Sequence, residues 1–420
     1  MKYPLIHTRF FVLLCLIVST MACQSLLPGS ETPTVVSIAN LKPMILTDGK
    51  SPSFIDVIGS LPDKAGTYLV YSELFSEQAG QVKYVSTGGT VQGDLLSYSE
   101  IDNWFPSPFM SSEQPGPRFA FTDYHEGEIT LRNNELRVWI TNSFGEPLYS
   151  WHLNTEPSSN ADCDSPSFSP SGHWMVLICS ASGQYYVDLV NLASGGQKVI
   201  PIPDGATTVP VENWSQDENH FYIWSHTYIY CFVSLLNDVA GCSDVGKPVL
   251  SVSPDWQHVV LFNGDMPYNP DRTVPGVQIS IVDMECVLNG SYCENSMDFE
   301  LPFRQSMAGN SYSYPTIRWN ASGSKLAWMN SPYIDQASQE SVVSPSCGWI
   351  TLSEKTSQFL CEQIMSKAFL LDISPDENWL LLSDERSLYL LSTREPDIRR
   401  LLTPTSEFGV ISFYGWIIVQ

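Results

Sequence analysis

A short polar turn that leads into three apolar residues recurs five times along the chain, and it limits the folds that the sequence can adopt. The last copy covers residues 374–379, Ser-Pro-Asp-Glu-Asn-Trp, and runs into Leu380–Leu382. Ser or Asn opens such a turn by bonding its own backbone, and Pro presets φ at the next position. The apolar residues that follow favour a strand. The earlier copies begin, at spacings of 38 to 67 residues, at Ser169, Ser215, Ser253 and Asn320.

Each copy predicts a strand, a tight turn and a second strand. An apolar residue stands just before the copies, namely Phe168, Trp214, Val252, Trp319 and Ile373. A unit that repeats about every 40 residues with insertions is typical of propeller blades. Residues 66–92 and 116–152 resemble blades that lack the turn, so we expect an all-β propeller of about seven four-stranded blades, with six or eight as alternatives. A β-sandwich with coincidental turns is the competing interpretation.

The copies between residues 165 and 403 resemble the Ser-Pro-Asp-Gly blades of the TolB translocation protein and of the prolyl oligopeptidase propellers. Only Ser169, Ser253 and Ser374 keep the Ser-Pro opening, and only two copies keep the Gly. The resemblance implies a TolB-like fold and says almost nothing about function.

The amino-terminal residues predict export. Lys2 and Arg9 precede an apolar run too short to span a bilayer, so residues 1–22 read as a signal peptide. A small residue before Cys23 resembles a bacterial lipobox, although Thr20 departs from it, and predicts Cys23 as a lipid anchor. An ordinary secretory signal is the alternative. Residues 23–50, rich in Ser, Thr, Pro and Gly, then read as a flexible tether, and residues 51–420 as the propeller.

Eight further cysteines fall into four pairs that are adjacent in sequence. Strand residues that oppose each other lie within disulfide range, and Asn289-Gly290 is a strong signal for a hairpin. The competing interpretation, a reduced protein with metal-binding cysteines, is disfavoured because no Cys-x-x-Cys occurs. We expect the bridges Cys163–Cys179, Cys231–Cys242, Cys286–Cys293 and Cys347–Cys361.

The formal net charge of −24 argues against nucleic acid or an anionic membrane surface as a partner. The membrane is then reached through the lipid anchor alone. No cofactor is expected. Ca²⁺ is the weak alternative, because Asn160, Asp162 and Asp164 alternate like the start of a calcium loop, yet no Gly or closing Glu follows. Capping of a turn explains these residues better.

No catalytic motif is intact. Residues 241–248 nearly match a phosphate loop, but Pro248 replaces the required hydroxyl residue. The chain has no Gly-x-Ser-x-Gly elbow and no His-Glu-x-x-His. His173, His220 and His258 recur at or beside one repeat position, which indicates packing rather than metal binding.

The last apolar segment, Val410–Trp416, has no partner strand of its own, whereas the first blade near residues 66–92 is one strand short. Pairing the two would close the ring and remove two sheet edges.

Two functional hypotheses remain. The first is an extracytoplasmic, lipid-anchored module that binds or scaffolds a protein, peptide or glycan. The second is a propeller enzyme, a hydrolase or lyase, with a polar cluster in the central channel. The missing motifs favour the first, and clustered carboxylates or histidines at the channel would favour the second.

Overall fold

The structure is a computed structural model, and its described strands lie within residues 38–420. The residues that it describes are 42–44, 55–76, 79–99, 107–110, 117–124, 135–141, 147–154, 162–163, 167–170, 173–181, 184–191, 196–203, 211–224, 228–263, 277–289, 293, 296–301, 315–329, 333–334, 341–343, 346–362, 368–384, 387–394, 398–402 and 411–419.

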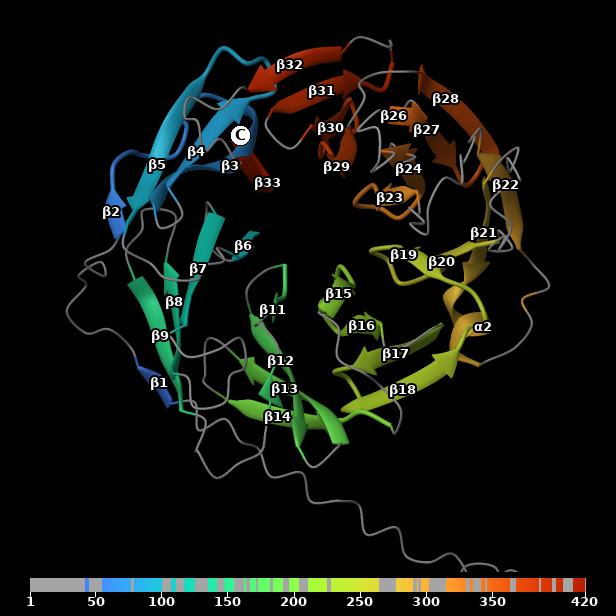
Figure 1. The fold of residues 1–420 in the computed structure, drawn as a ribbon, viewed down its shortest axis with the longest axis horizontal. Coiled ribbons are helices and arrows are strands. Elements are labelled where there is room, and N and C mark those ends of the chain that lie inside the picture. Colours follow the sequence, from blue (N-terminus) through green and yellow to red (C-terminus); the bar gives the residue numbers. More distant parts are fainter. Residues whose placement is uncertain are drawn as a thin grey trace, which may run out of the picture. The chain divides into compact units, whose positions relative to one another are not determined.

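The described strands form seven antiparallel sheets of four or five strands each and one separate two-stranded hairpin (Figure 1). We number them as blades in chain order. Blade 1 contains β2 (Ile55–Val57), β3 (Gly66–Ser76), β4 (Ala79–Ser86), β5 (Gln92–Tyr98) and β33 (Ile411–Val419). Blade 2 contains β1 (Lys42–Met44), β6 (Ser107–Met110), β7 (Pro117–Tyr124), β8 (Glu135–Thr141) and β9 (Pro147–Asn154). Blade 3 contains β10 (Asp162–Cys163), β11 (Ser167–Phe168), β12 (Trp174–Ala181), β13 (Gln184–Asn191) and β14 (Gln197–Pro201).

The remaining four blades follow the same order. Blade 4 contains β15 (Val211–Trp214), β16 (His220–Trp224), β17 (Ile229–Ser234) and β18 (Val239–Asp244). Blade 5 contains β19 (Val249–Val252), β20 (His258–Phe262), β21 (Val277–Asp283) and β22 (Met297–Leu301). Blade 6 contains β23 (Thr316–Trp319), β24 (Lys325–Met329), β27 (Ser346–Thr351) and β28 (Thr356–Glu362), with a separate hairpin of β25 (Tyr333–Ile334) and β26 (Ser341–Val343). Blade 7 contains β29 (Phe369–Ile373), β30 (Trp379–Ser383), β31 (Leu388–Ser392) and β32 (Ile398–Leu402).

The prediction of an all-β propeller is therefore confirmed. In each of blades 4 to 7 the first strand lies at the inner edge of its sheet, and the following strands lie progressively further out (Figure 1). The inner strands of neighbouring blades touch, since β23 contacts both β19 and β29. The repeat thus places the strand that precedes each of these four turns at the inner edge of its blade.

The hydrophobic core is divided into clusters that lie between consecutive blades. Phe221 and Ile223 of blade 4 pack with residues of blade 3, whereas Tyr222 between them packs with blade 5. Successive strand residues point to opposite faces of a sheet, so the apolar triplets of blades 4 to 7 each supply both neighbouring interfaces. This explains why three apolar residues follow each turn without a polar residue between them.

The ring closes through the two ends of the propeller. Strand β33 pairs antiparallel with β3, and Leu69 lies opposite Trp416. The expected pairing of the last segment with the first blade is confirmed. The closing strand also enters the interface with blade 7, where Leu69 and Trp416 share a core cluster with Leu381 and Leu390. Closure thus removes a free edge from blade 1 and buries apolar surface on the adjoining blade.

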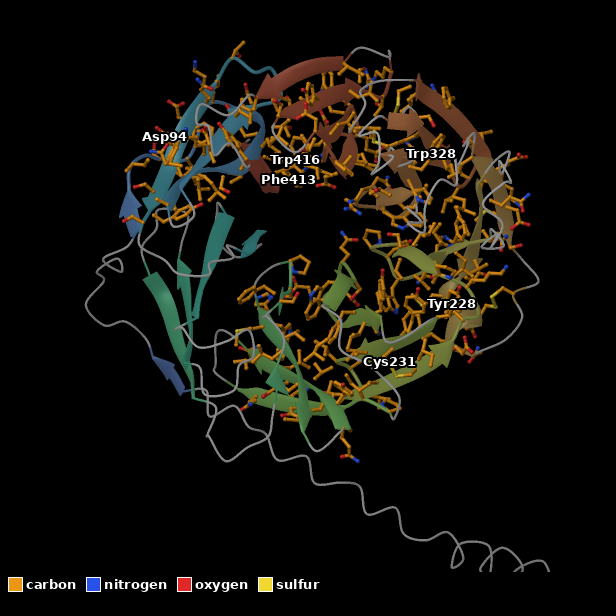
Figure 2. All side chains as sticks on the ribbon, viewed as in Figure 1. Asp94, Tyr228, Cys231, Trp328, Phe413 and Trp416 are labelled. Atoms are coloured by element: carbon orange, nitrogen blue, oxygen red, sulfur yellow. A yellow bond between two sulfur atoms is a disulfide. The ribbon has the colours of Figure 1, made fainter. Side chains whose placement is uncertain are left out.

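Among the cysteines whose side chains the structure describes, three of the expected pairs are bridged. The sulfur atoms lie 2.02 Å apart in Cys231–Cys242, 1.93 Å in Cys286–Cys293 and 1.99 Å in Cys347–Cys361. Cys163 lies opposite Cys179 in the register of β10 and β12, and Cys179 is disulfide-bonded. Cys231, which Figure 2 labels within blade 4, faces Cys242 across the β17–β18 hairpin.

One local prediction was wrong. Residues before Asn289 were expected to enter a hairpin, but Met284–Leu288 form a short helix, α2, that carries Cys286. Met284 and Val287 on this helix are buried in the core between blades 4 and 5. Covering that interface requires two apolar residues three positions apart, which a helix places on one face. Asn289 then caps the helix, with its backbone N–H bonded to the carbonyl of Glu285.

The predicted tether also ends earlier than expected. Lys42–Met44, placed by the sequence within residues 23–50, form β1 and pair with β9 at the edge of blade 2. A proline is compatible with such an edge position because it lacks the N–H that an inner strand must donate. Cys23 and the predicted signal peptide, residues 1–22, lie outside the described residues, as do Asn160 and Asp164. No described segment is a helix long and apolar enough to cross a bilayer.

Candidate functional site: the pocket at the inner strands

The recurring turn is built on one buried side chain. Ser374 Oγ accepts a hydrogen bond from the backbone N–H of Trp379 at 3.0 Å and donates to Asp376 at 2.6 Å. Asp376 in turn accepts from the backbone N–H of Asn378. Ser374 is 1% exposed. Its hydroxyl therefore takes the place of water as the hydrogen-bond partner of the Trp379 N–H and of the Asp376 carboxylate. The turns that begin at Ser215 and Ser253 repeat this arrangement.

The Asn320 turn shows which part of this chemistry is required. Asn320 Oδ1 accepts from the backbone N–H of Lys325 at 2.9 Å, as the serine hydroxyl does elsewhere. Asn320 is also buried, and its amide donates to Ser322 and Ser324. Position one of the repeat therefore needs a short side chain with an acceptor, and Ser or Asn both supply it.

The fourth position of the turn has a left-handed backbone, which explains the Gly of the resembled motif. φ is 69° at Gly323, and it is 55°, 59° and 57° at Glu218, Trp256 and Glu377. A non-glycine residue in this region is uncommon. Where this chain keeps a side chain there, the side chain reaches the preceding blade. Glu218 lies 3.4 Å from His173 Nδ1, and Trp256 stacks on His220 with ring centroids 5.5 Å apart.

The three recurring histidines lie at interfaces between blades. His220 and Trp256 belong to blades 4 and 5, and His258 of blade 5 stacks on Trp319 of blade 6 at 6.4 Å. Packing therefore accounts for the positions of these side chains. Among the residues that the structure describes, no three His, Cys, Asp or Glu side chains are placed to hold a metal ion.

A pocket of about 460 Å³ opens on the inner strands of blades 4 to 7. We call it the channel pocket. It is lined by Trp214, Leu250, Ser251, Val252, Pro254, Ile317, Arg318, Trp319 and Asp372. All but Pro254, which lies in the turn after β19, come from β15, β19, β23 and β29, the strands that Figure 1 shows at the inner edges of their blades.

The polar side chains of the channel pocket occupy one repeat position. Ser251, Arg318 and Asp372 each stand two residues before the first residue of their turn, and Ser167 and Asn213 hold the same position in blades 3 and 4. In β19 and β29 the pairing register shifts immediately before this position. Such bulges re-aim side chains next to functional sites. The position is thus polar in five blades, with a different side chain wherever it lines the pocket.

Arg318 is exposed, yet its guanidinium is held by backbone carbonyls. Its Nε donates to Leu371 O of blade 7 at 2.7 Å, and Nη1 donates to Ile317 O at 3.0 Å. Among the described residues that line the channel pocket, Arg318 is the one basic residue. The guanidinium thus lies in the pocket lining together with the carboxyl group of Asp372.

Asp372 is the acidic neighbour of Arg318. Its burial raises its pKa, which hydrogen bonds from the backbone of Ile373 and from Trp416, together with the charge of Arg318, lower only in part. Trp416 Nε1 donates to Asp372 Oδ2 at 3.0 Å. Figure 2 shows Trp416 beside Phe413 at the inner end of blade 1, near blade 7. The acid thus connects the channel pocket to the strand that closes the ring.

A second pocket, of about 380 Å³, contains the remnant of the phosphate-loop motif. Val239–Asp244 form β18, and Asp244 Oδ1 accepts the backbone N–H of Gly246 at 2.9 Å. Cys242 is held in its bridge. A carboxylate therefore takes an N–H that a phosphate would need, and the sequence-based rejection of this motif agrees with the geometry. A chain of hydrogen bonds crosses this pocket. Lys247 Nζ donates to Asn263, the Asn263 amide donates to Ser280, and the Ser280 hydroxyl donates to Asp298.

Sequence reasoning did not identify Arg318 or Asp372 as site residues. Their signal was present, because both stand at the polar position two residues before the repeat. Recognising it required knowing that the first strand of each unit lies innermost, which fixes the side that this position faces.

Comparisons with known proteins return structural likeness only. No protein-family model matches the sequence. No curated protein matches it either.

Several solved structures are similar to the chain in fold. TolB from Acinetobacter baumannii is 13% identical, with a TM-score of 0.37, over 82% of this chain and 81% of that one. The β-propeller domain of the Trilobed protease from Pyrococcus furiosus is 11% identical, with a TM-score of 0.44, over 72% and 84%. Kuenenia stuttgartiensis hydrazine synthase is 11% identical, with a TM-score of 0.43, over 70% and 78%. At these values the likenesses carry no argument about function, and the propeller assignment rests on the sheets themselves.

Proposed function

We propose that the protein is an extracytoplasmic binding module, anchored by lipid at Cys23, whose channel pocket receives part of a protein, peptide or glycan partner. The carrying observation is that Ser251, Arg318 and Asp372 from three different blades converge on one pocket. The repeat holds the scaffold constant while this position varies, as in folds that carry recognition on a rigid frame.

The disulfides support the proposed compartment. Bridges such as Cys231–Cys242 persist in oxidising surroundings and are rare in the cytosol. The anchor is tested by Cys23→Ser, which should release the protein from membranes and abolish lipid labelling. An unprocessed Met1 at the terminus of the isolated protein would contradict export.

The binding function is tested by affinity capture from the native envelope, at low and high salt, with and without chelator. Wild-type protein is compared with Arg318→Glu, which reverses the charge in the pocket, and with Arg394→Glu, which makes the same change at an exposed residue near the end of β31. We expect a reproducible partner with wild type and Arg394→Glu that is lost with Arg318→Glu. If Arg318→Glu captured the partner as well as wild type does, the partner would bind elsewhere on the molecule.

One observation favours the enzyme as a second candidate. Asp372 combines a raised pKa with an adjacent cation in a pocket, a combination that is found at catalytic acids. Turnover of a glycan, peptide or ester panel that Asp372→Asn abolishes, with the fold intact, would replace the binding proposal with an enzymatic one.

A further inference from the structure

We infer that the second pocket binds an aliphatic α-amino acid, with the ligand ammonium group at Asp298 and the ligand carboxylate at Lys247. The pocket has a volume of about 380 Å³ and lies between β18 of blade 4 and the strands β20 to β22 of blade 5. Among the described residues it shares no lining residue with the channel pocket. The inference is therefore independent of the proposed function and adds a site for a small molecule.

The pocket lies where blade 5 departs from its two neighbours. The fourth residue of the second strand stands opposite Cys231 in blade 4, Ser280 in blade 5 and Gly348 in blade 6. Their partners in the outermost strand are Cys242, Asp298 and Phe359. Blade 4 thus fills this position with a disulfide and blade 6 with an aromatic ring that packs on Trp328. Blade 5 has two small polar side chains there, and they line the pocket.

Opposite charges stand at the two ends of the hydrogen-bond chain in this pocket. The chain runs from Lys247 through Asn263 and Ser280 to Asp298. Ser280 is 3% exposed, which fixes the middle of the chain, whereas Lys247 and Asp298 are exposed at its ends. An ammonium group has three N–H donors and a carboxylate has two oxygens. The chain uses one donor of Lys247 and Oδ1 of Asp298, so a ligand can add a bond to each end group.

The charges of the lining favour a zwitterion over a simple ion. Lys247 is the one basic side chain among the described lining residues, and Asp244 and Asp298 are the acids. A simple anion would meet two carboxylates in a chain whose formal charge is −24. A simple cation would meet the ammonium group of Lys247. An amino acid gives each end of the hydrogen-bond chain a partner of opposite charge, and such charge-assisted bonds are the strong ones.

An apolar surface in the same pocket suits an aliphatic side chain. Leu261, Val282 and Val287 line the pocket and belong to the core cluster between blades 4 and 5. A ligand side chain that lies against them is removed from water, which favours binding roughly in proportion to the apolar area buried. The pocket therefore combines a charged rim with an apolar floor.

One wall of the pocket is held in place by covalent and hydrogen bonds. Helix α2 contacts β18 and β20 (Figure 1), and the carbonyl of Val287 on α2 accepts from Ser243 Oγ at 3.2 Å. The bridge Cys286–Cys293 ties the helix to another lining residue. A wall that is already ordered costs less conformational freedom when a ligand binds.

The test compares L-leucine with analogues that each lack one group. Isoamylamine lacks the carboxylate, isocaproate lacks the ammonium group and glycine lacks the aliphatic side chain. Glucose serves as a neutral polyol. Binding to the purified protein is followed by calorimetry and by ligand-observed NMR, with wild type, Asp298→Asn and Lys247→Gln. The matched controls, Glu300→Gln and Lys64→Gln, make the same kinds of change at exposed residues outside the pocket lining.

We expect leucine to bind at least about tenfold more tightly than each analogue. Asp298→Asn should abolish the preference for leucine over isocaproate and keep that over isoamylamine. Lys247→Gln should do the reverse, and the two controls should change neither preference. Asn at position 298 keeps an oxygen that can accept from Ser280. The comparison of leucine with its analogues needs no variant, so it holds even where a variant fails to fold.

The inference is overturned if leucine gives no binding signal, or if glucose binds more tightly than leucine. Equal binding of leucine and isoamylamine would reduce the pocket to a cation site, and equal binding of leucine and isocaproate would reduce it to an anion site. Preferences that survive in both Asp298→Asn and Lys247→Gln would place the ligand elsewhere. None of these results bears on capture through the channel pocket, so the proposed function stands or fails separately.

Discussion

Lys325 Nζ donates a hydrogen bond to Glu377 Oε2 at 2.8 Å, from the turn of blade 6 to the turn of blade 7. Asn320 Nδ2 donates to the other carboxylate oxygen at 2.7 Å. These two hydrogen bonds lower the pKa of Glu377, and the bond from Lys325 has the larger effect. Burial of the carboxylate acts in the opposite direction but is outweighed. Glu377 sits at the left-handed position of its turn, which directs the side chain across the interface. The pair therefore joins two blades through their recurring turns.

The Lys325–Glu377 pair should contribute a small, salt-sensitive coupling. Both side chains are about a third exposed, so solvent screens the attraction. A double-mutant cycle of Lys325→Met and Glu377→Gln, followed by urea unfolding, should give a coupling of about 0.5–1 kcal/mol at low salt. The coupling should fall in 1 M salt. A value above about 2 kcal/mol would show that the pair is far better shielded than its exposure implies.

Ser374→Ala should destabilise the fold by about 1–3 kcal/mol, because it removes a buried hydroxyl that accepts from the backbone N–H of Trp379 and donates to Asp376. The matched control is Ser353→Ala, at an exposed residue of the β27–β28 turn, which should change the free energy of unfolding by less than about 0.5 kcal/mol. Equal effects of the two substitutions would mean that the hydroxyl of the repeat does not hold the turn.

Asp217 should contribute stability that disappears in acid. Burial alone raises its pKa, but hydrogen bonds from Ser215 and Asn219 and the charge of His220 outweigh it and lower the pKa to about 2. An ordinary aspartate has a pKa of about 3.9. The stabilisation is therefore present above about pH 4 and is lost as pH falls towards 2. NMR titration should find the low pKa and its rise in Ser215→Ala; titration of wild-type Asp217 near pH 4 would contradict it.

Asp372 should behave in the opposite sense, because its pKa is raised. The protonated carboxyl contributes its full stability below the pKa of the unfolded chain. This stability is lost as pH rises through the higher pKa of the folded protein. Asp372→Asn keeps an acceptor for Trp416 without the charge and should leave stability at pH 7 unchanged or higher. Asp372→Leu removes the acceptor and should cost about 1–3 kcal/mol. Similar thermal unfolding of the two variants would mean that the bond to Trp416 contributes little.

Removal of residues 408–420 should open the ring. β3 would keep β4 but lose its inner partner β33, and an unpaired apolar edge recruits other chains. We expect aggregation and a lower unfolding temperature, measured by light scattering and calorimetry. Removal of Gln420 alone, which lies beyond β33, is the control. A truncated protein that stays soluble and equally heat-stable would disprove closure by β33.

The sequence predicted the ring because its signals are local. Ser374 and its counterparts make hydrogen bonds to groups within five residues. All residues that form the turn therefore lie in one short segment of the sequence. The apolar triplets report strands that are buried on both faces, and the three bridged cysteine pairs are close in sequence. The pairing of the last strand with the first could also be inferred, because each end lacked a partner.

The channel pocket depended on geometry that no single segment encodes. Arg318 and Asp372 lie far apart in the chain and meet because successive inner strands stand side by side. The short helix at Met284–Leu288 was missed for a similar reason, since the Asn289-Gly290 signal is local whereas the demand to bury Met284 and Val287 comes from the neighbouring blade. The start of β1 at Lys42 was hidden because three residues show no periodicity.

The closing strand also sets an order of events during synthesis. β3 leaves the ribosome among the first strands of the propeller, and its partner β33 leaves last. Contacts between such distant segments slow folding, and until they form, blade 1 displays an unpaired edge. Every chain cut short of Ile411, whatever its length, keeps that edge. A closed ring thus distinguishes chains that contain β33 from chains that lack it, and proteases that recognise exposed strands would remove the latter selectively.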